Sequence, residues 1–462
     1  MFKMENKKVV IMGFGVTGQA AIKYLTNKSA VVSVYDSRKE SDFDSNLLNK
    51  FSDAEFNFET NDFNPEEFDL IVTSPGVSVE KSEILKSARD LGIPIHNDTT
   101  LFIEEWRKIG PIVGVTGSNG KSTVVSLLYE SIKDQCSVVL GGNIGASPLD
   151  FLYSKPEPGT IAILELSSYQ LELFKSEHYL DICLITNISS NHLDRYGGSI
   201  EKYSDAKMLG IDNSNTQFIT TTDDDGVKKY ILPKLKVKNF YDVSFEQLVD
   251  EAVEDGIYTN EKGELILKTG DKIDLVFDNV EKRNLIGLHN LYNIGFVLGI
   301  INLLNLSTSK SIQKIREFRG LEHRIEKVRE LNGVTYVNDS KSTSPAATNV
   351  ALESLGKNNN VVLIIGGTDK GIDFSSLENS FLNKVKEIVL LPGGIEDKIL
   401  KIKDELDIKT TEIEKMSEAV EYANQVAVSG DVVLLSPASG SFHQYTSFEK
   451  RGEDFKEIVN KI

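Results

Sequence analysis

The sequence is poor in cysteine and lacks long apolar runs. Of its 462 residues only Cys136 and Cys183 carry thiols, and they lie far apart without the spacing of metal ligands. This scarcity excludes a disulfide-stapled scaffold and a thiolate metal centre, and it fits a reducing cytosol. No apolar stretch approaches the roughly 20 residues that span a bilayer. We therefore expect a cytoplasmic chain with no membrane insertion.

The chain also lacks an excess of positive charge. Its formal net charge is −18, which argues against a surface for nucleic acid or anionic membranes. The lysines near the N-terminus precede a short apolar run, but Gly13, Gly15 and Gly18 interrupt that run and no signal-peptide cleavage pattern follows. With 40% hydrophobic residues and this length, the sequence predicts a globular α/β protein of about three domains.

A glycine-rich turn between a strand and a helix organises the rest of the chain. An apolar run (111–115) leads into Thr116-Gly-Ser-Asn-Gly-Lys-Ser-Thr123, and a helical pattern follows. Glycines let backbone N–H groups face an anion, and the helix N-terminus adds a positive dipole end. Lys121 is placed to reach phosphates, and the Ser122 hydroxyl to bind Mg²⁺. Val115 stands where the strict P-loop pattern has glycine, yet the context predicts an ATP site.

The N-terminal segment, which we expect to form a Rossmann-like domain over residues 1–97, contains a second glycine turn. A strand over 8–12 precedes Gly13-Phe-Gly-Val-Thr-Gly18, and Asp36 follows 18 residues after Gly18. This spacing is close to the roughly 20 residues of a dinucleotide fingerprint, although any nucleotide diphosphate satisfies the pattern. Further strands are expected over 30–35, 69–73 and 93–96. Ser74-Pro75-Gly76 follows the strand over 69–73, at the carboxyl end where such sheets bind ligands.

In the central segment, expected over 98–306 as a P-loop ATPase-like domain, polar residues follow predicted strand ends. Glu165 ends the strand over 160–164 and is placed to hold Mg²⁺. His192 follows the strand over 181–186, while Gly142-Asn143 follows another over 137–140. The sequence pattern alone predicts that Lys207 is a surface lysine of a helix. Residues 255–280 alternate and turn like hairpins at an antiparallel edge.

The C-terminal segment, expected over 307–462, predicts a Rossmann-like parallel sheet. Strands are expected over 334–337, 361–365, 387–391 and 431–435, and each ends in a polar, Gly- or Ser-rich tip. Because parallel strands bring their carboxyl ends to one edge, these tips should share a site. Lys341 and Lys370 lie at two of them, which favours an anionic ligand.

Taken together these motifs resemble the Mur ligase family over the whole chain. The phosphate loop (116–123), Leu321-Glu-His-Arg324, Asn338-Asp-Ser-Lys341 and the stretch 434–452 carry the resemblance. The last stretch resembles the members that add D-glutamate, whose first domain binds UDP rather than NAD. The resemblance implies ATP-dependent ligation of D-glutamate to UDP-N-acetylmuramoyl-L-alanine through an acyl phosphate, a cytoplasmic step of peptidoglycan precursor synthesis. It also implies ATP and Mg²⁺ as cofactors, and we expect a monomer.

The resemblance further implies residue roles. ATP would be held by Gly117, Asn119, Gly120, Lys121, Ser122, Thr123, Asn290, Asn293, His323, Arg324 and Asp339. The UDP substrate would contact Gly15, Val16, Thr17, Asp36, Ser37, Arg38, Ser74, Gly76, Asn143 and His192. D-Glutamate would be received by Thr343, Lys370, Ser441 and Phe448. The metal would be bound by Ser122, Glu165, His192 and a carbamylated Lys207. The catalytic residues would be Lys121, His192, Lys207 and Lys341.

Three other functions stay open on the sequence. A nicotinamide dehydrogenase would explain Gly13–Gly18 and Asp36, but it leaves the second phosphate loop without a purpose. A folate polyglutamate ligase shares the ATP chemistry, but it is expected to lack a Rossmann-type domain in front. A non-enzymatic nucleotide switch is the third alternative, and ATP turnover that requires both a carboxylate and an amine would argue against it.

Overall fold

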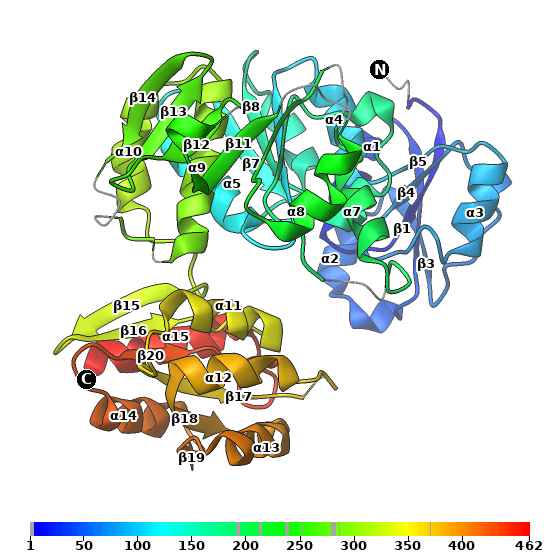
Figure 1. The fold of residues 1–462 in the computed structure, drawn as a ribbon. Helices are drawn as coiled ribbons and strands as arrows, with labels where there is room; N and C mark the ends of the chain where they lie inside the picture. Colours follow the sequence, from blue (N-terminus) through cyan, green and yellow to red (C-terminus); the bar gives the residue numbers. More distant parts are fainter. Residues whose placement is uncertain are drawn as a thin grey trace. The chain divides into compact units, whose positions relative to one another are not determined.

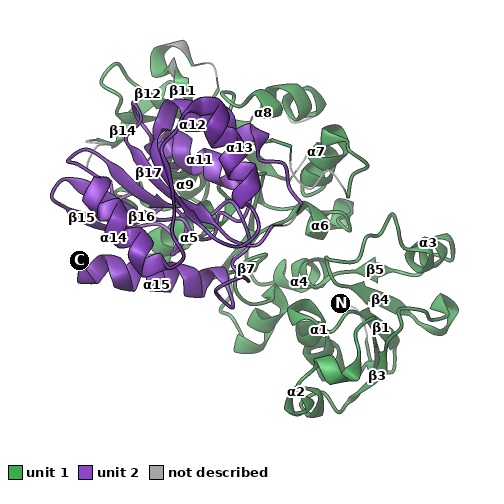
Figure 2. Ribbon diagram, turned by 90° about the horizontal axis from the view of Figure 1, so that it is seen from below, with its two compact units in different colours: residues 1–281, 292–315 green, residues 282–291, 316–462 purple. Residues whose placement is uncertain are grey.

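The structure is a computed structural model that describes residues 4–190, 195–211, 215–235, 240–252, 254–278, 283–285, 287–369 and 371–462. Within these ranges the strands form three sheets (Figure 1). The chain separates into two compact units, one of Met1–Glu281 with Tyr292–Ile315 and one of Lys282–Leu291 with Arg316–Ile462 (Figure 2). The first unit contains two of the sheets, and each unit is described by itself.

The N-terminal sheet has the strand order β3-β2-β1-β4-β5, with all neighbours parallel. Its strands are β1 (Lys8–Met12), β2 (Val31–Asp36), β3 (Ala54–Phe58), β4 (Leu70–Thr73) and β5 (Ile95–His96). Its helices are α1 (Val16–Asn27), α2 (Ser45–Asn49), α3 (Glu83–Asp90) and α4 (Asp98–Trp106). The strand order reverses between β1 and β4, so a crevice opens at their carboxyl ends. The sequence analysis missed β3, an edge strand whose side chains are only partly buried.

Alternate residues of β1 pack on opposite faces of this sheet, as the two-residue period of a strand requires. Val9 and Ile11 join the cluster that includes α1 and α4, whereas Val10 and Met12 join the cluster that includes α3. Helices therefore cover both faces, and the near-continuous apolar run of β1 follows from burial on two sides.

The central sheet has the order β14-β13-β12-β11-β10-β9-β6-β8-β7. The strands are β6 (Ile112–Thr116), β7 (Val138–Gly142), β8 (Ile161–Glu165), β9 (Ile182–Ile185), β10 (Gln217–Thr220), β11 (Tyr241–Leu248), β12 (Gly256–Thr259), β13 (Leu265–Thr269) and β14 (Lys272–Phe277). The helices are α5 (Lys121–Ile132), α6 (Ser168–Leu171), α7 (Ile200–Met208), α8 (Asp225–Tyr230), α9 (Leu288–Leu303) and α10 (Thr308–Glu317). β12, β13 and β14 pair antiparallel, which confirms the predicted hairpin edge. β10 and β11 were not predicted.

The C-terminal sheet has the order β15-β16-β20-β17-β18-β19. The strands are β15 (Glu326–Leu331), β16 (Val334–Asn338), β17 (Val361–Gly366), β18 (Val385–Leu391), β19 (Thr410–Glu412) and β20 (Val432–Leu435). The helices are α11 (Pro345–Leu355), α12 (Glu378–Lys384), α13 (Glu396–Leu406), α14 (Met416–Val426) and α15 (Phe448–Lys461). The four predicted strands run parallel, as expected, and β15 adds an antiparallel edge. Buried clusters place α11–α13 on one face and α14–α15 on the other.

Short 3-10 turns connect several of these elements. They are η1 (Glu40–Asp42), η2 (Pro65–Glu67), η3 (Pro148–Ser154), η4 (Ser176–His178), η5 (Leu232–Lys234), η6 (Val249–Glu251) and η8 (Ser375–Leu377). None of the helices in the described ranges is long and apolar enough to span a bilayer.

Candidate active site

The loop between β6 and α5 has the backbone shape of a phosphate cradle. Gly117 and Gly120 have φ of +131° and +86°, in the region that favours glycine. A Cβ at Gly117 would lie 2.0 Å from Thr186 Oγ1, and one at Gly120 2.7 Å from Asn293 Oδ1. The close approach puts Asn293, a predicted ATP residue, beside the loop.

Two lysines converge on this loop. Lys121 Nζ donates to the Gly117 and Ser118 carbonyls at 2.9 Å each, and Lys207 Nζ donates to the Gly117 carbonyl at 2.9 Å. Lys207 is 1% exposed, so its assignment to a surface was wrong. Burial, with the Lys121 charge adding to it, lowers the pKa of Lys207 well below the usual lysine range. The loop thus has two lysine side chains where phosphates would bind.

Hydroxyls and amides of the β9 tip brace the same loop. Thr186 Oγ1 donates to the Asn119 carbonyl at 2.6 Å, and Asn187 Oδ1 accepts from the Asn119 N–H at 3.0 Å. Ser118 Oγ lies 3.1 Å from the Tyr203 hydroxyl on α7, the helix that also presents Lys207. The neighbouring strands and α7 therefore fix the loop before any ligand arrives.

Glu165, the last residue of β8, is 3% exposed. Its Oε1 accepts from Asn143 Nδ2 at 3.1 Å, while its Oε2 has no hydrogen-bond partner within the described ranges. A buried carboxylate oxygen without a donor is costly unless a cation or water satisfies it. Val115 of β6 is the register partner of Glu165, so this carboxylate lies at the same sheet edge as the phosphate loop.

The glycine turn after β1 is organised around a carboxylate. Asp36 Oδ2 accepts the Phe14 N–H at 2.7 Å, and the Arg38 guanidinium binds both Asp36 oxygens at 2.9 and 2.7 Å. Burial alone would raise the pKa of Asp36, but these hydrogen bonds outweigh it and hold the pKa at about 2. A Cβ on Gly18 would lie 2.0 Å from the Gly13 carbonyl, so α1 can approach β1 only with glycine there.

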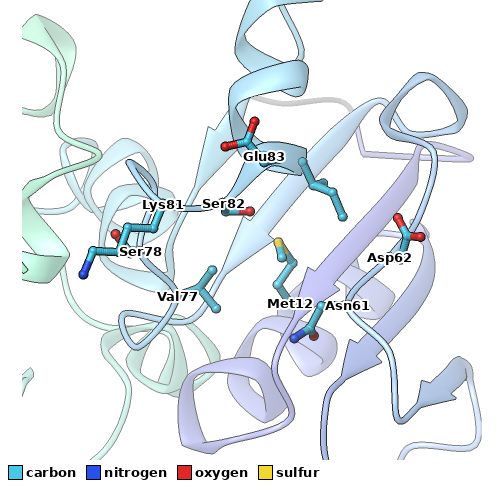
Figure 3. Close-up of a pocket in the computed structure, with 9 residues that line it drawn as sticks. Met12, Asn61, Asp62, Val77, Ser78, Lys81, Ser82 and Glu83 are labelled. Atoms are coloured by element: carbon cyan, nitrogen blue, oxygen red, sulfur yellow. The ribbon is translucent and has the colours of Figure 1, made fainter.

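A cavity of about 560 Å³ lies at the carboxyl ends of β1 and β4 (Figure 3). Met12 is the last residue of β1, Val77 comes from the turn after β4, and Ser82 is the N-cap of α3. The cavity adjoins the turn that contains the predicted substrate residues Ser74 and Gly76, and Ser74 Oγ lies 3.5 Å from the Gly13 carbonyl. At the same sheet edge, Gly15 is the N-cap of α1, Val16 and Thr17 begin this helix, and Ser37 follows β2.

In the second unit, a buried network surrounds Asp339 and His323. His323 Nδ1 lies 2.9 Å from Asn338 Nδ2, and its backbone has φ of +63°. Asp339 accepts from Ser436 Oγ at 2.7 Å and from the Ile325 N–H at 3.2 Å. Burial raises the pKa of Asp339 to about 6, against the lowering effect of these hydrogen bonds. Arg324, also predicted to bind ATP, is exposed beside them.

Lys341 and Phe448 meet in the same unit. Lys341 Nζ lies 5.1 Å from the centroid of the Phe448 ring, a cation–π distance. Sequence reasoning assigned no role to Arg451, which is buried and donates to Ser340 O at 2.9 Å and to Gly440 O at 3.2 Å. Burial lowers its pKa to about 10. Arg451 thereby joins the tips of β16 and β20, next to the buried Ser441.

The predicted residues thus form three groups. The phosphate-loop group brings together Gly117, Asn119, Gly120, Lys121, Ser122, Thr123, Asn143, Glu165, Lys207 and Asn293. The second group is the glycine turn after β1, and the third lies in the second unit around His323, Asp339, Lys341, Thr343, Ser441 and Phe448. Asn290 precedes Asn293 by one helical turn in α9. His192 and Lys370 lie outside the described residues.

A further cluster was not predicted. His96, Glu104 and His178 bring potential metal-ligand atoms within 4.8 Å of one another. His178 Nδ1 accepts the Lys175 N–H at 3.0 Å, so its proton sits on Nε2, which faces Glu104 at 3.2 Å. Metal binding through Nε2 would break that arrangement. The cluster is a hydrogen-bonded joint between β5, α4 and η4.

Comparison with known proteins identifies the family of the chain. The family described as Mur ligase MurD-like, N-terminal domain matches residues 7–97, the Mur ligase middle domain matches 115–301, and the Mur ligase glutamate ligase domain matches 323–439. Together with the near full-length relatives below, these matches show that the chain belongs to the Mur ligase family.

Individual relatives indicate which members of this family the chain resembles. The UDP-N-acetylmuramoylalanine–D-glutamate ligase of Nitrosococcus oceani is 35% identical, covering 98% of this chain and 96% of its own. That of Saccharophagus degradans is 34% identical, covering 99% and 98%. Two Thermotoga maritima structures share the fold: the UDP-N-acetylmuramate-alanine ligase MurC (18% identity, TM-score 0.58, 99% and 100% covered) and MurF in complex with ADP (20%, 0.56, 99% and 96%).

Proposed function

We propose that this chain is a UDP-N-acetylmuramoylalanine–D-glutamate ligase. It catalyses the ATP-dependent addition of D-glutamate to UDP-N-acetylmuramoyl-L-alanine in peptidoglycan precursor synthesis, as the names of its near full-length relatives state for them. The structural observation that carries the proposal is the convergence of Lys121 and Lys207 on the Gly117 carbonyl of a glycine cradle.

The chemistry needs a cationic group such as Lys121 at this loop. A carboxylate is a poor electrophile, so the L-alanyl carboxylate attacks the γ-phosphorus of ATP, ADP leaves, and an acyl phosphate forms. The D-glutamate amine then attacks the acyl carbon, a proton is lost and inorganic phosphate leaves. Both steps bring anions together, and fixed positive groups stabilise the charge that develops. Lys121 supports the phosphates, and we assign Lys341 to the transferred phosphate.

The residues at the loop fit Mg²⁺, a hard cation that prefers oxygen ligands. Ser122 Oγ and the unpartnered Glu165 Oε2 would hold it, with His192 as a further ligand. When bound, the ion neutralises phosphate charge. Asn143, which donates to Glu165 Oε1, positions this carboxylate.

Lys207 is suited to carbamylation. Its lowered pKa leaves more of the amine neutral at physiological pH, and a neutral amine attacks CO₂ with loss of a proton. The resulting carbamate would be an acidic group that no longer repels Lys121 and that supplies an oxygen ligand to the metal.

The other two groups of predicted residues bind the remaining parts of the substrates. The glycine turn after β1, with Asp36, Ser37, Arg38, Ser74 and Gly76, takes the UDP moiety. Asn290, Asn293, His323, Arg324 and Asp339 take adenosine, while Thr343, Lys370, Ser441 and Phe448 receive D-glutamate. We further propose domain boundaries at 97/98 and 306/307, a monomeric state and a cytoplasmic location.

The test is phosphate release from ATP and Mg²⁺ with UDP-N-acetylmuramoyl-L-alanine and a panel of amino acids of both hands. Release with D-glutamate alone supports the whole proposal. Release with another amino acid keeps the ligase but reassigns the pocket around Ser441 and Phe448. If no amino acid gives release, the ligase assignment is wrong.

A further inference from the structure

Arg195 forms hydrogen bonds to side-chain and backbone groups next to the turn after β4, Ser74–Gly76, which is proposed to bind the UDP substrate. It follows the segment that contains His192, and it is 9% exposed. Its Nε and Nη2 donate to the two Glu172 carboxylate oxygens at 2.9 and 2.6 Å. Its guanidinium carbon lies 4.1 Å from the centroid of the Tyr169 ring. Glu172 and Tyr169 belong to the α6 region of the central domain, so the guanidinium is fixed from that side by a bidentate pair and a stacked ring.

The other face of the guanidinium holds the turn after β4. Nη1 donates to the Pro75 carbonyl at 3.0 Å, and Nη2 donates to the Val77 carbonyl at 3.1 Å. The turn is closed by a hydrogen bond from the Val77 N–H to the Ser74 carbonyl at 3.0 Å. One arginine side chain of the central domain therefore sets the orientation of two peptide planes in the N-terminal domain.

This orientation determines where the turn presents its donors. No peptide bond in the described residues is cis, and in a trans peptide the C=O and the following N–H point in opposite directions. Because the Pro75 carbonyl points to Arg195, the Gly76 N–H points away from it. The Val77 carbonyl fixes the Ser78 N–H in the same way. Without the guanidinium, the Pro75–Gly76 plane could rotate and withdraw that donor.

We propose that Arg195, held by Glu172, is a positioning residue that orients the Gly76 amide toward the UDP substrate. The inference rests on the proposed role of the Ser74–Gly76 turn in binding UDP-N-acetylmuramoyl-L-alanine.

The test compares Arg195→Lys and Glu172→Gln with the wild-type enzyme. Lysine keeps the charge but cannot donate to both carbonyls and the carboxylate in one plane. We expect the KM for UDP-N-acetylmuramoyl-L-alanine to rise about tenfold in Arg195→Lys and about threefold in Glu172→Gln, with the KM for ATP changed less than about twofold. Calorimetric titration with UDP-N-acetylmuramoyl-L-alanine should show the same losses of affinity.

Lys28→Met is the matched control. Lys28, the C-cap residue of α1, pairs with Glu105 of α4 at 3.2 Å, so the variant also breaks an ion pair between the N-terminal segment and α4, but it leaves the turn untouched. Its KM for the UDP substrate should equal that of the wild type. Unchanged KM values in both test variants, or equal increases for ATP and the UDP substrate, would overturn the inference while the ligase assignment stands. An inactive wild-type enzyme would instead overturn the proposed function.

Discussion

The first unit contains two glycine-rich turns that look alike in sequence and differ in their chemistry. Both follow a parallel strand and lead into a helix. The turn after β1 is closed by an acid: Asp36 accepts the Phe14 N–H and binds Arg38. The turn after β6 is surrounded by lysines, with Lys121 and Lys207 on the Gly117 carbonyl.

In the proposed function, this difference explains how the same backbone arrangement, a glycine-rich turn before a helix, serves two different nucleotides. A helix N-terminus with free N–H groups attracts an anion in either turn. An ionised carboxylate in the first would repel a triphosphate, but it accepts hydroxyl donors such as those of a sugar. The Lys121 cation in the second favours a triphosphate and the anions formed from it. In the proposed function, the side chains around each turn, and not the glycines, therefore distinguish the proposed UDP site from the proposed ATP site.

The most severe test of this contrast is Lys207→Ala. The substitution removes the group that donates to the Gly117 carbonyl and, in the carbamylated form, a metal ligand. We expect kcat to fall on the order of 10³-fold, with partial rescue by short carboxylic acids such as acetate. Steady-state phosphate release measures both effects. Lys202→Ala, on the exposed face of the same helix, is the control. Full activity of Lys207→Ala would end the carbamate proposal.

Substituting one glycine in each turn should separate the two ligands. In Gly117→Ala the new Cβ would lie 2.0 Å from Thr186 Oγ1 at a φ of +131°, so the loop must shift and the KM for ATP should rise about tenfold or more. In Gly18→Ala the Cβ would lie 2.0 Å from the Gly13 carbonyl, and the KM for the UDP substrate should rise instead. Initial-rate kinetics with each substrate varied measure both constants.

Gly270→Ala is a control for backbone strain alone. Gly270 has φ of +57° in the β13–β14 hairpin, and a Cβ at this position would have no atom of the described residues within 4 Å beyond its chain neighbours. Its kinetic constants should match the wild type despite a small loss of stability. If the two loop variants raised both KM values equally, the two turns would not be separate sites.

A smaller effect is expected from Asp36→Asn. Losing a hydrogen bond to a charged group costs about 1.5–3 kcal/mol, so the KM for the UDP substrate should rise about tenfold while the KM for ATP stays constant. Stability should also change with pH. The folded pKa of about 2 is below the ordinary 3.8, so Asp36 stabilises the fold above pH 3.8, and this contribution is lost as the pH falls toward 2.

Thermal unfolding of Asp36→Asn should therefore depend less on pH than that of the wild type between pH 4 and 2. Asp339→Asn provides a comparison, because the contribution of Asp339 to stability changes with pH in the opposite direction. The pKa of Asp339 is raised to about 6, so its stabilising effect is present below pH 3.8 and is lost as the pH rises through 6. If the melting temperatures of Asp36→Asn and the wild type changed equally with pH, the ionised Asp36 carboxylate would not be stabilised by the folded protein.

Strong local patterns predicted most of the fold. β1, β6 and four strands of the C-terminal sheet, β16, β17, β18 and β20, are apolar runs that lead into polar or glycine-rich turns, and the structure places them within one or two residues of expectation. The edge strand β3 and the strands β10 and β11 were missed because their side chains are partly exposed or their runs are short. Edge strands lack the burial that makes a sequence pattern visible.

The site was less predictable, because burial joins residues that are distant in the chain. Lys207 carries no sequence signal that distinguishes it from an exposed helix lysine, yet it lies against Thr116 and Gly117. Arg195 and Arg451 were missed for a related reason: each donates to backbone carbonyls, which any residue can supply. Their neighbours appear only once the sheets are assembled.

The smallest effect we predict concerns how the second turn is braced. The Tyr203 hydroxyl lies 3.1 Å from Ser118 Oγ, which also accepts from the Ser189 N–H at 2.9 Å. Tyr203→Phe removes one of these bonds but keeps the ring, whose centroid lies 4.5 Å from Lys207 Nζ. We expect about 1 kcal/mol of stability to be lost and the KM for ATP to rise less than about fivefold, without change for the UDP substrate. The ring is retained in this variant. A loss of kcat as large as that of Lys207→Ala would therefore mean that the Tyr203 hydroxyl itself takes part in catalysis, and that the two lysines alone do not explain the activity of the turn after β6.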